Sequence, residues 1–287
     1  MNTPASCLLT DFGVLRFEGA DAGKFLQGQL SNDVGRLTAG AILRAGLHSP
    51  QGRTVSLLWL AKHAEGHILA LLPRELATAV TTQLKRYLLR AKLSITDDSD
   101  RCQLLGRWQA GVSSLLPGEW RLDSERALSL QPAGEPAAPD VVMTREQWRA
   151  LDVSVGAPQV YAATSGQFVA QMINLDCVDA VSFTKGCYTG QEVIARAHYR
   201  GRVKRRMQRF ETLESARLAP GDTGRLDDGR AFRVVEAVTR ADGRSEFLAV
   251  APLPAAAPEA EAGPAGAAAQ APALRVQTLP LPYVLPE

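Results

Sequence analysis

The stretch KGCYTGQEVIAR, from Lys185 to Arg196, places a cysteine in a polar turn directly before an expected helix. Thr189 and Glu192 stand three residues apart, which is the spacing of a capping box, so we expect Thr189 to cap that helix. Glycine is a poor helix former. Gly190 in the first turn therefore indicates that another group approaches the backbone closely there, and the same argument applies to Gly186.

Cys187 lies two residues before the expected cap, close to the positive end of the helix dipole. Lys185 is two residues away, and Arg196 follows on the same helix. Each of these positive groups favours the thiolate over the thiol, which would make Cys187 a nucleophile, a metal ligand or a redox-sensitive group. A cysteine can equally be a small buried apolar side chain, and the spacing leaves both interpretations open.

Several polar or aromatic residues near this stretch allow the same two interpretations. Tyr188 can stack on a flat ligand or pack half-buried. Gln171, Asn174 and Asp176 offer the paired amide and carboxylate groups that bind a heterocycle such as a pterin, or they stabilise a loop by Asx turns. Asn32 and Asp33 follow the first expected helix, where they bind a ligand or form a turn.

Chain length, net charge and cysteine content exclude few classes of function. The chain has 287 residues, enough for two or three domains, and its net charge of +2 does not indicate a general nucleic-acid binder. Its four cysteines form no C-x-x-C pair, which favours a reducing compartment. The N-terminal stretch shows neither a signal peptide nor a membrane span, so we expect a cytoplasmic protein with no membrane contact.

The order of patterns predicts an α+β fold. Residues 1–100 alternate expected strands at 13–17, 54–60, 67–72 and 92–98 with helices that begin after Asp21 and extend over 73–90. Residues 101–206 hold further strands and a helix that Thr144 should cap with Gln147. Residues 207–287 show short strands separated by turns, which predicts an antiparallel β-barrel. The Ala- and Pro-rich segment 254–273 is expected to be a mobile loop.

Two further groups of residues give weaker signals. The basic run from Arg200 to Arg209 can bind phosphates, including those of a tRNA, or form a solvated face. His63 and His67 are four residues apart, but Gly66 predicts a turn between strands, and we therefore expect no metal site. His198 falls roughly two to three helical turns beyond Cys187, too far to act as its base.

The chain resembles the YgfZ family, the folate-binding relatives of the glycine-cleavage T-protein. The resemblance rests on KGCYTGQEVIAR at 185–196, HYRGRVKRR at 198–206 and FVAQMINLD at 168–176, with Ala170 where the family usually has proline. FLQGQLSNDV at 25–34, SPQGR at 49–53 and KRYLLR at 85–90 also match. The family's functional cysteine and lysine fall on Cys187 and Lys185.

This resemblance implies two interlocked α+β domains and a C-terminal β-barrel around a central opening that holds a tetrahydrofolate or a derivative. It implies a role in assembling or repairing iron–sulfur clusters in client enzymes, including tRNA-modifying ones. The residues expected to contact the folate are Asn32, Asp33, Gln171, Asn174, Asp176, Tyr188, Gln191, Glu192 and Arg196.

Two alternative functions stay open from the sequence. The first is a folate-dependent aminomethyl-type transferase. Val55 and Ser56 stand near the place where the T-protein has an aspartate pair, and the missing carboxylate speaks against this transfer. The second is a tRNA-binding module built on the basic run. The sequence does not decide whether Cys187 acts by covalent, iron-ligating or redox chemistry.

Overall fold

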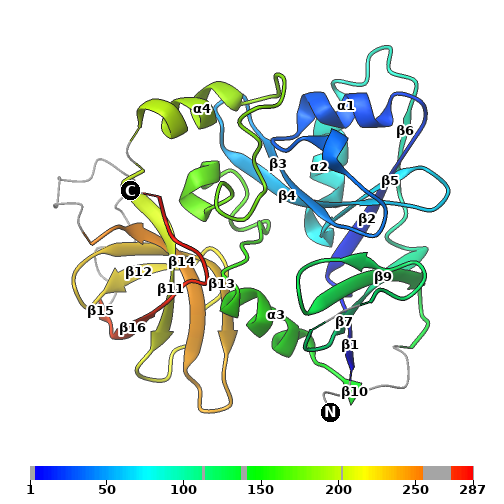
Figure 1. Cartoon of the computed structure of the whole chain (residues 1–287). Helices are drawn as coiled ribbons and strands as arrows, with labels where there is room; N and C mark the ends of the chain where they lie inside the picture. The colour runs from blue at the N-terminus through cyan, green and yellow to red at the C-terminus, as the bar shows by residue number, and fades with distance from the viewer. Residues whose placement is uncertain (1–3, 112–113, 137–140, 202, 255–272, 287) are drawn as a thin grey trace.

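The computed structural model describes residues 4–111, 114–136, 141–201, 203–254 and 273–286. Its strands form three sheets that lie around an irregular central segment (Figure 1). The mixture of helices with mostly antiparallel sheets confirms the predicted α+β class. No helix within the described ranges has the length and apolar character that crossing a membrane requires.

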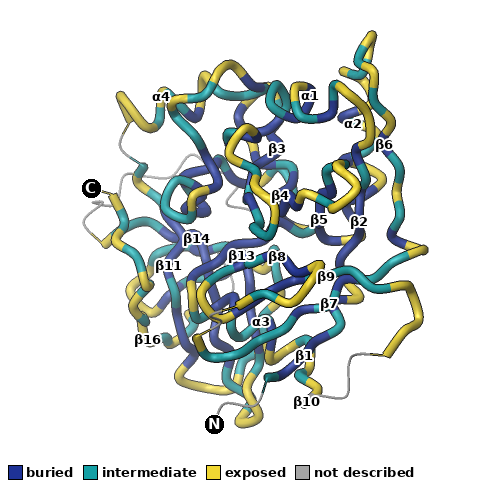
Figure 2. The backbone as a smooth tube through the Cα atoms, turned by 45° about the vertical axis from the view of Figure 1, so that its right-hand side comes forward, coloured by how far each residue is buried: buried dark blue, intermediate teal, exposed yellow. Residues whose placement is uncertain are grey.

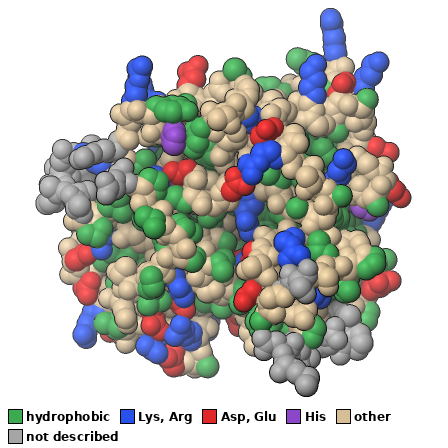
Figure 3. Space-filling model, viewed as in Figure 1, with side chains coloured by type: hydrophobic (Ala, Val, Ile, Leu, Met, Phe, Trp, Pro, Cys, Tyr) green, Lys and Arg blue, Asp and Glu red, His purple; other side chains and the backbone are tan. Residues whose placement is uncertain are grey.

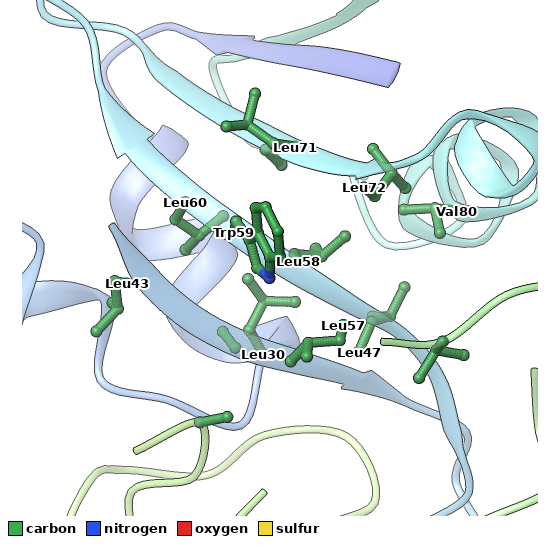
Figure 4. Packing of buried hydrophobic residues seen from close by; sticks show 14 of the residues in the cluster. Leu30, Leu43, Leu47, Leu57, Leu58, Trp59, Leu60, Leu71, Leu72 and Val80 are labelled. Carbon is green, nitrogen blue, oxygen red and sulfur yellow. The ribbon is translucent and has the colours of Figure 1, made fainter. Parts of the chain in front are cut away.

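The first sheet is formed by residues of the N-terminal hundred in the order β3-β4-β5-β2-β6, with antiparallel neighbours throughout. Its strands are β2 (Phe12–Glu18), β3 (Leu43–His48), β4 (Thr54–Lys62), β5 (Ile68–Pro73) and β6 (Ser94–Asp97). Its helices are α1 (Ala22–Gln29) and α2 (Ala77–Lys85), with short 3-10 turns η1 (Val34–Arg36) and η2 (Arg74–Leu76). Leu57, Leu58 and Trp59 of β4 lie among other buried side chains in its core (Figure 4).

Two helix predictions in this region hold only in part. Asp21 precedes α1 as predicted, but its carboxylate accepts the Lys92 backbone N–H instead of capping α1. The helix expected over 73–90 begins as the 3-10 turn η2 and ends at Lys85. Leu84 is the last buried residue of its apolar stripe, because the chain beyond it turns back toward β6.

The second sheet has the order β10-β1-β7-β9-β8, and the N-terminal strand lies within it. Its strands are β1 (Ala5–Leu8), β7 (Cys102–Trp108), β8 (Trp120–Arg121), β9 (Arg126–Pro132) and β10 (Val141–Val142). The helix α3 (Arg145–Ser154) follows, and the predicted capping box between Thr144 and Gln147 is confirmed. Because β1 pairs with β7, the division at residue 100 separates two hydrogen-bonded strands. The domain boundaries stay predictions.

The third sheet is curled and has the order β15-β12-β13-β14-β11-β16 (Figure 1). Its strands are β11 (Arg205–Thr212), β12 (Thr223–Leu226), β13 (Ala231–Thr239), β14 (Ser245–Pro252), β15 (Ala273–Leu274) and β16 (Val276–Leu279). Phe210, Phe232 and Phe247 form its separate core. Within the described residues no ladder joins the edge strands β15 and β16, and β15 pairs parallel to β12. The sheet is therefore an open, curled version of the expected antiparallel barrel.

The expected mobile loop at 254–273 falls almost entirely outside the described residues, which stop at Pro254 and resume at Ala273.

His48, at the end of β3, is fully buried. An added β-carbon on Gly46 would collide with its ring, so the glycine makes room for it. Neither ring nitrogen has a hydrogen-bond partner within the described part of the chain. Burial without a partner disfavours the charged form and lowers the pKa of His48 to about 3.

This burial predicts a pH-dependent stability. The unfolded chain takes up a proton near the ordinary histidine pKa of about 6.5, whereas folded His48 stays neutral until about 3. Stability is therefore unaffected above pH 6.5 and falls as the pH drops from 6.5 toward 3. At pH 5 the loss from this group is about 2 kcal/mol. Chemical unfolding at pH 7.5 and pH 5 should show that His48→Leu loses less stability than the wild type over this interval. Equal losses in both proteins would contradict the assignment.

Candidate functional site around the motif loop

Residues 182–190, called the motif loop here, precede α4 (Gln191–Arg200). The chain before it, from Gly156 onward, is mostly irregular and includes one 3-10 turn, η3 (Ala170–Ile173). Hydrogen bonds hold this segment against the first sheet. The Thr54 N–H donates to the Phe168 carbonyl at 2.7 Å, and the Ser31 hydroxyl donates to the Ala180 carbonyl at 2.7 Å. Stretches far apart in sequence thus meet beside the motif loop.

Lys185 ties the motif loop to the C-terminal end of α1. Its ammonium donates to the carbonyls of Gln27 and Leu30 at 2.6 Å each and to that of Asn32 at 3.0 Å. Carbonyls at a helix C-terminus lack partners within the helix and attract cations. Burial lowers the pKa of Lys185 to about 8, and nearby Asp33 acts against that shift. All three ammonium protons are used by these carbonyls, so Lys185 is a positioning group here.

Gly190 makes the second contact that fixes the motif loop. It has φ of 82° and stands as the N-cap of α4, which has no side-chain cap bond. The capping box predicted at Thr189 and Glu192 is therefore wrong. An added β-carbon on Gly190 would overlap the Ser49 carbonyl oxygen and lie 3.2 Å from the Gly52 α-carbon. The expected close approach is real, and it comes from the SPQGR turn. For Gly186 it is not observed, since nothing lies within 4 Å of an added β-carbon.

Gly52 makes the same contact from the other side. Its φ is 72°, and an added β-carbon would lie 2.7 Å from the Val193 β-carbon on α4. The turn that it closes has Gly52 N–H donating to the Ser49 carbonyl at 2.9 Å. Two glycines, far apart in sequence, are thus required for the turn and the start of α4 to touch.

Cys187 lies between these two ties and is exposed. The other three thiols differ from it. Cys7 is buried, and burial raises its pKa to about 11. Burial also raises the pKa of Cys177 to about 11 and shifts that of Cys102 upward. Cys187 is therefore the most exposed of the four cysteines, since Cys102 and Cys177 are partly buried, and the interpretation of it as a buried apolar side chain is excluded.

The basic groups predicted to assist Cys187 are arranged differently from the expectation. The ammonium of Lys185 is occupied by carbonyls, while Arg196 is exposed on α4. Much of the outer side of α4 is coloured as exposed in Figure 2. His198 stacks on Phe183, with ring centroids 3.7 Å apart and an interplanar angle of 12°. The stacking engages one face of the His198 ring, and the expectation that His198 does not serve as a base for Cys187 stays a prediction.

Tyr188 packs inside the loop. Tyr188 is 9% exposed. The centroid of its ring lies 5.0 Å from the Lys185 ammonium and 6.3 Å from the centroid of the His48 ring. Burial raises the pKa of Tyr188 to about 12. The packing interpretation therefore holds, because little of the residue is left for a ligand. The ring stabilises the lysine through a cation–π contact.

Gln171, Asn174 and Asp176 meet around a buried arginine. Arg206 on β11 forms a two-pronged ion pair with Asp176, at 3.0 and 2.9 Å. Asn174 has φ of 55°, and its amide donates to the Met207 carbonyl and to the Tyr283 hydroxyl. Gln171 donates to the Ile194 carbonyl at 2.7 Å. These groups join the irregular segment to α4 and the third sheet, so the loop-stabilising interpretation describes what they do.

One atom of this group stands apart. The Gln171 Oε1 is buried and has no partner within the described residues. A buried acceptor without a donor costs stability, which makes it a candidate contact for a ligand N–H.

Asn32 fits the interpretation as a turn-forming residue, whereas the position of Asp33 is compatible with ligand binding. The Asn32 amide is fully buried and donates to the carbonyls of Arg44 and Asp179 at 2.8 and 2.7 Å. Asp33 is partly exposed, and its Oδ1 accepts from the Gly35 N–H and from the Gln27 amide, both at 3.0 Å. Asn32 thus holds the loop after α1, whereas Asp33 lies at a surface.

Two open hollows flank α1. The first has a volume of about 340 Å³ and is lined by Asp21, Lys24, Phe25, Gly28, Gln29, Arg90 and Ala91. The second has a volume of about 310 Å³ and is lined by Gly23, Lys24, Gln27, Asp33, Val34 and Gly35. Asp33 is the one predicted ligand contact that lines either of them. Glu192 and Arg196 are exposed on α4, and Gln191 accepts the Tyr188 N–H.

The basic run is not a continuous exposed face. Arg206 is 4% exposed and paired with Asp176. Arg209 pairs with Glu246, and Arg205 donates to the Ala231 carbonyl at 3.1 Å. Strand β11 turns these three side chains toward neighbouring elements, whereas Arg200 and Lys204 are exposed. The tRNA contact over Arg200–Arg209 stays a prediction. On α4, Arg196 and Arg200 are exposed.

Comparison with solved structures defines the class of protein. The chain is similar to the glycine cleavage system aminomethyltransferase T from Bartonella henselae, with a TM-score of 0.64 and 12% identity over 87% of this chain and 78% of that one. At this identity the similarity concerns the fold alone. The chain thus has a T-protein-like α+β fold.

Comparison of sequences then gives the family. The chain is 32% identical over 267 residues to the tRNA-modifying protein YgfZ of Escherichia coli O7:K1, covering 82% of each chain. The tRNA-modifying protein YgfZ of Shigella boydii serotype 18 is also 32% identical, over 268 residues and 82% of each chain. An uncharacterised protein of Haemophilus influenzae is 32% identical over 205 residues, 71% of this chain and 72% of that one. No family model matches. The chain belongs to the YgfZ family.

Three partners of the site are not among the residues predicted from the sequence. Tyr283, Arg206 and His48 each contact or support predicted residues from a distance of many positions along the chain. Of these, Arg206 lies in the stretch RRMQRFET, where an inward-facing arginine requires a buried acidic partner.

The Gly190 contact predicts a difference between two glycines of the same motif. Gly190→Ala should destabilise the protein by at least about 1–2 kcal/mol, since an L-residue is strained at positive φ and the new methyl group overlaps the SPQGR turn. Gly186→Ala is the matched control and should change stability by less than about 0.5 kcal/mol. Urea unfolding of both variants measures the difference. A Gly190→Ala variant as stable as the control would contradict the close approach.

Proposed function

We propose that this protein is a folate-binding accessory factor that supports the assembly or repair of iron–sulfur clusters in client enzymes, including tRNA-modifying ones. Membership of the YgfZ family supports this proposal, as do curated relatives named tRNA-modifying proteins. The T-protein-like fold supports a folate as the small-molecule partner. Fold similarity alone does not supply a reaction, so the chemistry must come from the side chains of the site.

The exposure of Cys187 is the observation that carries the proposal. A thiol on the surface of a loop can ligate iron, accept a one-carbon unit or respond to oxidation. The loop is held on one side by Lys185 and on the other by Gly190, so the thiol keeps a defined position. A reactive group on a rigid loop is what a protein needs to act repeatedly on one class of partner.

The folate contacts follow from groups that keep polar atoms at a surface or without a partner. Asp33 lines a hollow of about 310 Å³, at the lower end of the range of ligand pockets. Its carboxylate suits the paired N–H groups of a pterin, and the Gln171 Oε1 is a further acceptor. Gln191, Glu192 and Arg196 follow at the start of α4, where Arg196 suits a carboxylate tail.

The remaining predicted contacts act indirectly in this proposal. Asn32, Asn174 and Asp176 hold the loops that border the site, and Tyr188 packs against Lys185. Replacing one of them would weaken folate binding through loss of local structure.

The surroundings of Val55 and Ser56 do not favour the transferase alternative. Ser56 is fully buried, and the Val55 carbonyl accepts the Ser165 hydroxyl. No carboxylate side chain is present at these two positions, so they cannot stabilise positive charge on a folate nitrogen.

A specific observation favours RNA contact as a second function. On α4, Tyr199 is 66% exposed and meets the His198 ring edge-on, while Arg196 and Arg200 are exposed on the same helix. Exposed aromatic rings beside arginines stack on unpaired bases and bind phosphates. Figure 3 shows apolar and histidine surface gathered over α4 at the upper left. We infer that a tRNA would contact this helix.

The Cys187 proposal is tested in cells and in solution. Cys187→Ser should fold normally but fail to restore methylthiolated tRNA in a strain that lacks the gene, whereas Cys102→Ser should restore it. In solution, a reduced folate should slow alkylation of Cys187. Full restoration by Cys187→Ser, with wild-type protein levels, would refute the thiol role. Alkylation at the same rate with and without folate would separate the thiol from the folate site.

The RNA contact is tested by charge reversal. Arg196→Glu with Arg200→Glu should weaken tRNA binding and reduce the slope of affinity against salt by about one unit for each phosphate that α4 no longer neutralises. Arg86→Glu, an exposed arginine just beyond α2, is the matched control and should bind like the wild type. If the wild-type protein bound tRNA with an affinity that did not depend on salt, RNA binding at α4 would be rejected.

A further inference from the structure

The hairpin loop between β4 and β5 gathers three side chains that the site described above does not use. The His63 N–H donates to the His67 carbonyl at 3.0 Å, and the Gly66 N–H donates to the His63 carbonyl at 2.9 Å. Gly66 has φ of 90°, as a three-residue hairpin loop requires at its last position. The turn was expected to argue against a metal site. Instead it sets the two histidines opposite each other across the hairpin.

The three side chains converge. The two imidazole rings stack with centroids 4.2 Å apart and an interplanar angle of 13°. The Glu65 Oε2 lies 3.9 Å from the His63 Nδ1 and 3.8 Å from the His67 Nδ1. One ligand atom from each residue lies within 4.8 Å of the other two. Ligands of a tetrahedral ion lie roughly 3.4 Å apart, so the cluster must contract slightly.

The contraction needs only side-chain rotation. In the stacked arrangement the nitrogen lone pairs lie in nearly parallel planes, so the rings must turn about their Cβ–Cγ bonds to face one ion. These torsions are soft in histidine. The Glu65 side chain is 77% exposed and therefore free of packing, and the His63 side chain is 33% exposed. The His67 side chain is only 9% exposed, so an ion would approach from the side of Glu65 and His63.

We propose that this hairpin loop binds one divalent transition-metal ion, of the zinc, nickel or copper class, through His63, His67 and Glu65. Two imidazoles and one carboxylate match the ligand preference of these ions. Calcium and magnesium prefer oxygen ligands alone and are not expected here. Three protein ligands leave the fourth position to water or to a partner's side chain.

The neighbouring charges are compatible with a cation. Arg16 on β2 lies near the hairpin, since Phe17 pairs with Ile68, but its guanidinium is bound to Asp98 and to Glu18. Figure 3 shows histidine surface beside acidic side chains at the right-hand edge of the molecule. A bound ion would join the ends of β4 and β5 and thereby stabilise the first sheet.

The experiment uses the full chain without an affinity tag, stripped of metal, with Cys187→Ser to remove the exposed thiol. Titration calorimetry with Zn²⁺ should show one bound ion. His63→Gln and His67→Gln should each weaken binding at least about tenfold, because even loss of an outer-shell partner costs about 10–100-fold. Glu65→Gln should weaken it less. His198→Gln, on α4, is the matched control and should bind like the parent.

Thermal unfolding gives an independent readout. Zn²⁺ should raise the melting temperature of the parent but not that of the His63→Gln/His67→Gln double variant, since only a ligand bound to the folded state stabilises it. Parent-like Zn²⁺ affinity in the double variant would overturn the proposal, as would the absence of saturable binding in the parent.

Discussion

The contact on which the motif loop depends is that of the Lys185 ammonium with the carbonyls of Gln27 and Leu30 at the end of α1 and of Asn32 just beyond it. The helix end supplies unpaired acceptors and a negative dipole, and Lys185 supplies the cation that satisfies both. This contact fixes the loop relative to the first sheet. The SPQGR turn then fixes the start of α4 through Gly190. Between the two contacts Cys187 is exposed, whereas Tyr188 turns inward against Lys185.

Local patterns predicted elements well where neighbours along the chain decide the structure. The capping box at Thr144 and the strands β2, β4 and β5 depend on residues a few positions apart. The equivalent capping-box pattern at Thr189 and Glu192 gave a wrong prediction. There the SPQGR turn, from a distant part of the sequence, requires a left-handed glycine at position 190, and the helix begins at that glycine without a side-chain cap. Tertiary approach outweighs a local capping preference.

The polar site was predicted less well because its partners lie far apart in the chain. Arg206 belongs to a run of basic residues that suggests an exposed face. It is nevertheless buried, because it forms an ion pair with Asp176, which lies thirty positions earlier in the chain. Asn174 in turn meets Tyr283 near the C-terminal end. The sequence identified the residues that matter around the motif, but only the fold separates those that hold the loops from those that face solvent.

The placement of β1 has a consequence for how the chain reaches its native state. Ala5–Leu8 must pair with β7, which is about a hundred residues further on, and with β10 beyond that. At about 5–20 residues per second, a ribosome needs about 5–20 s to produce β7 after β1. The first sheet can assemble from its own strands during this time, whereas the N-terminal strand waits unpaired. Pairing of this kind, between distant segments, is the slow part of folding. Strand β1 is therefore expected to join its sheet only after the first sheet has formed.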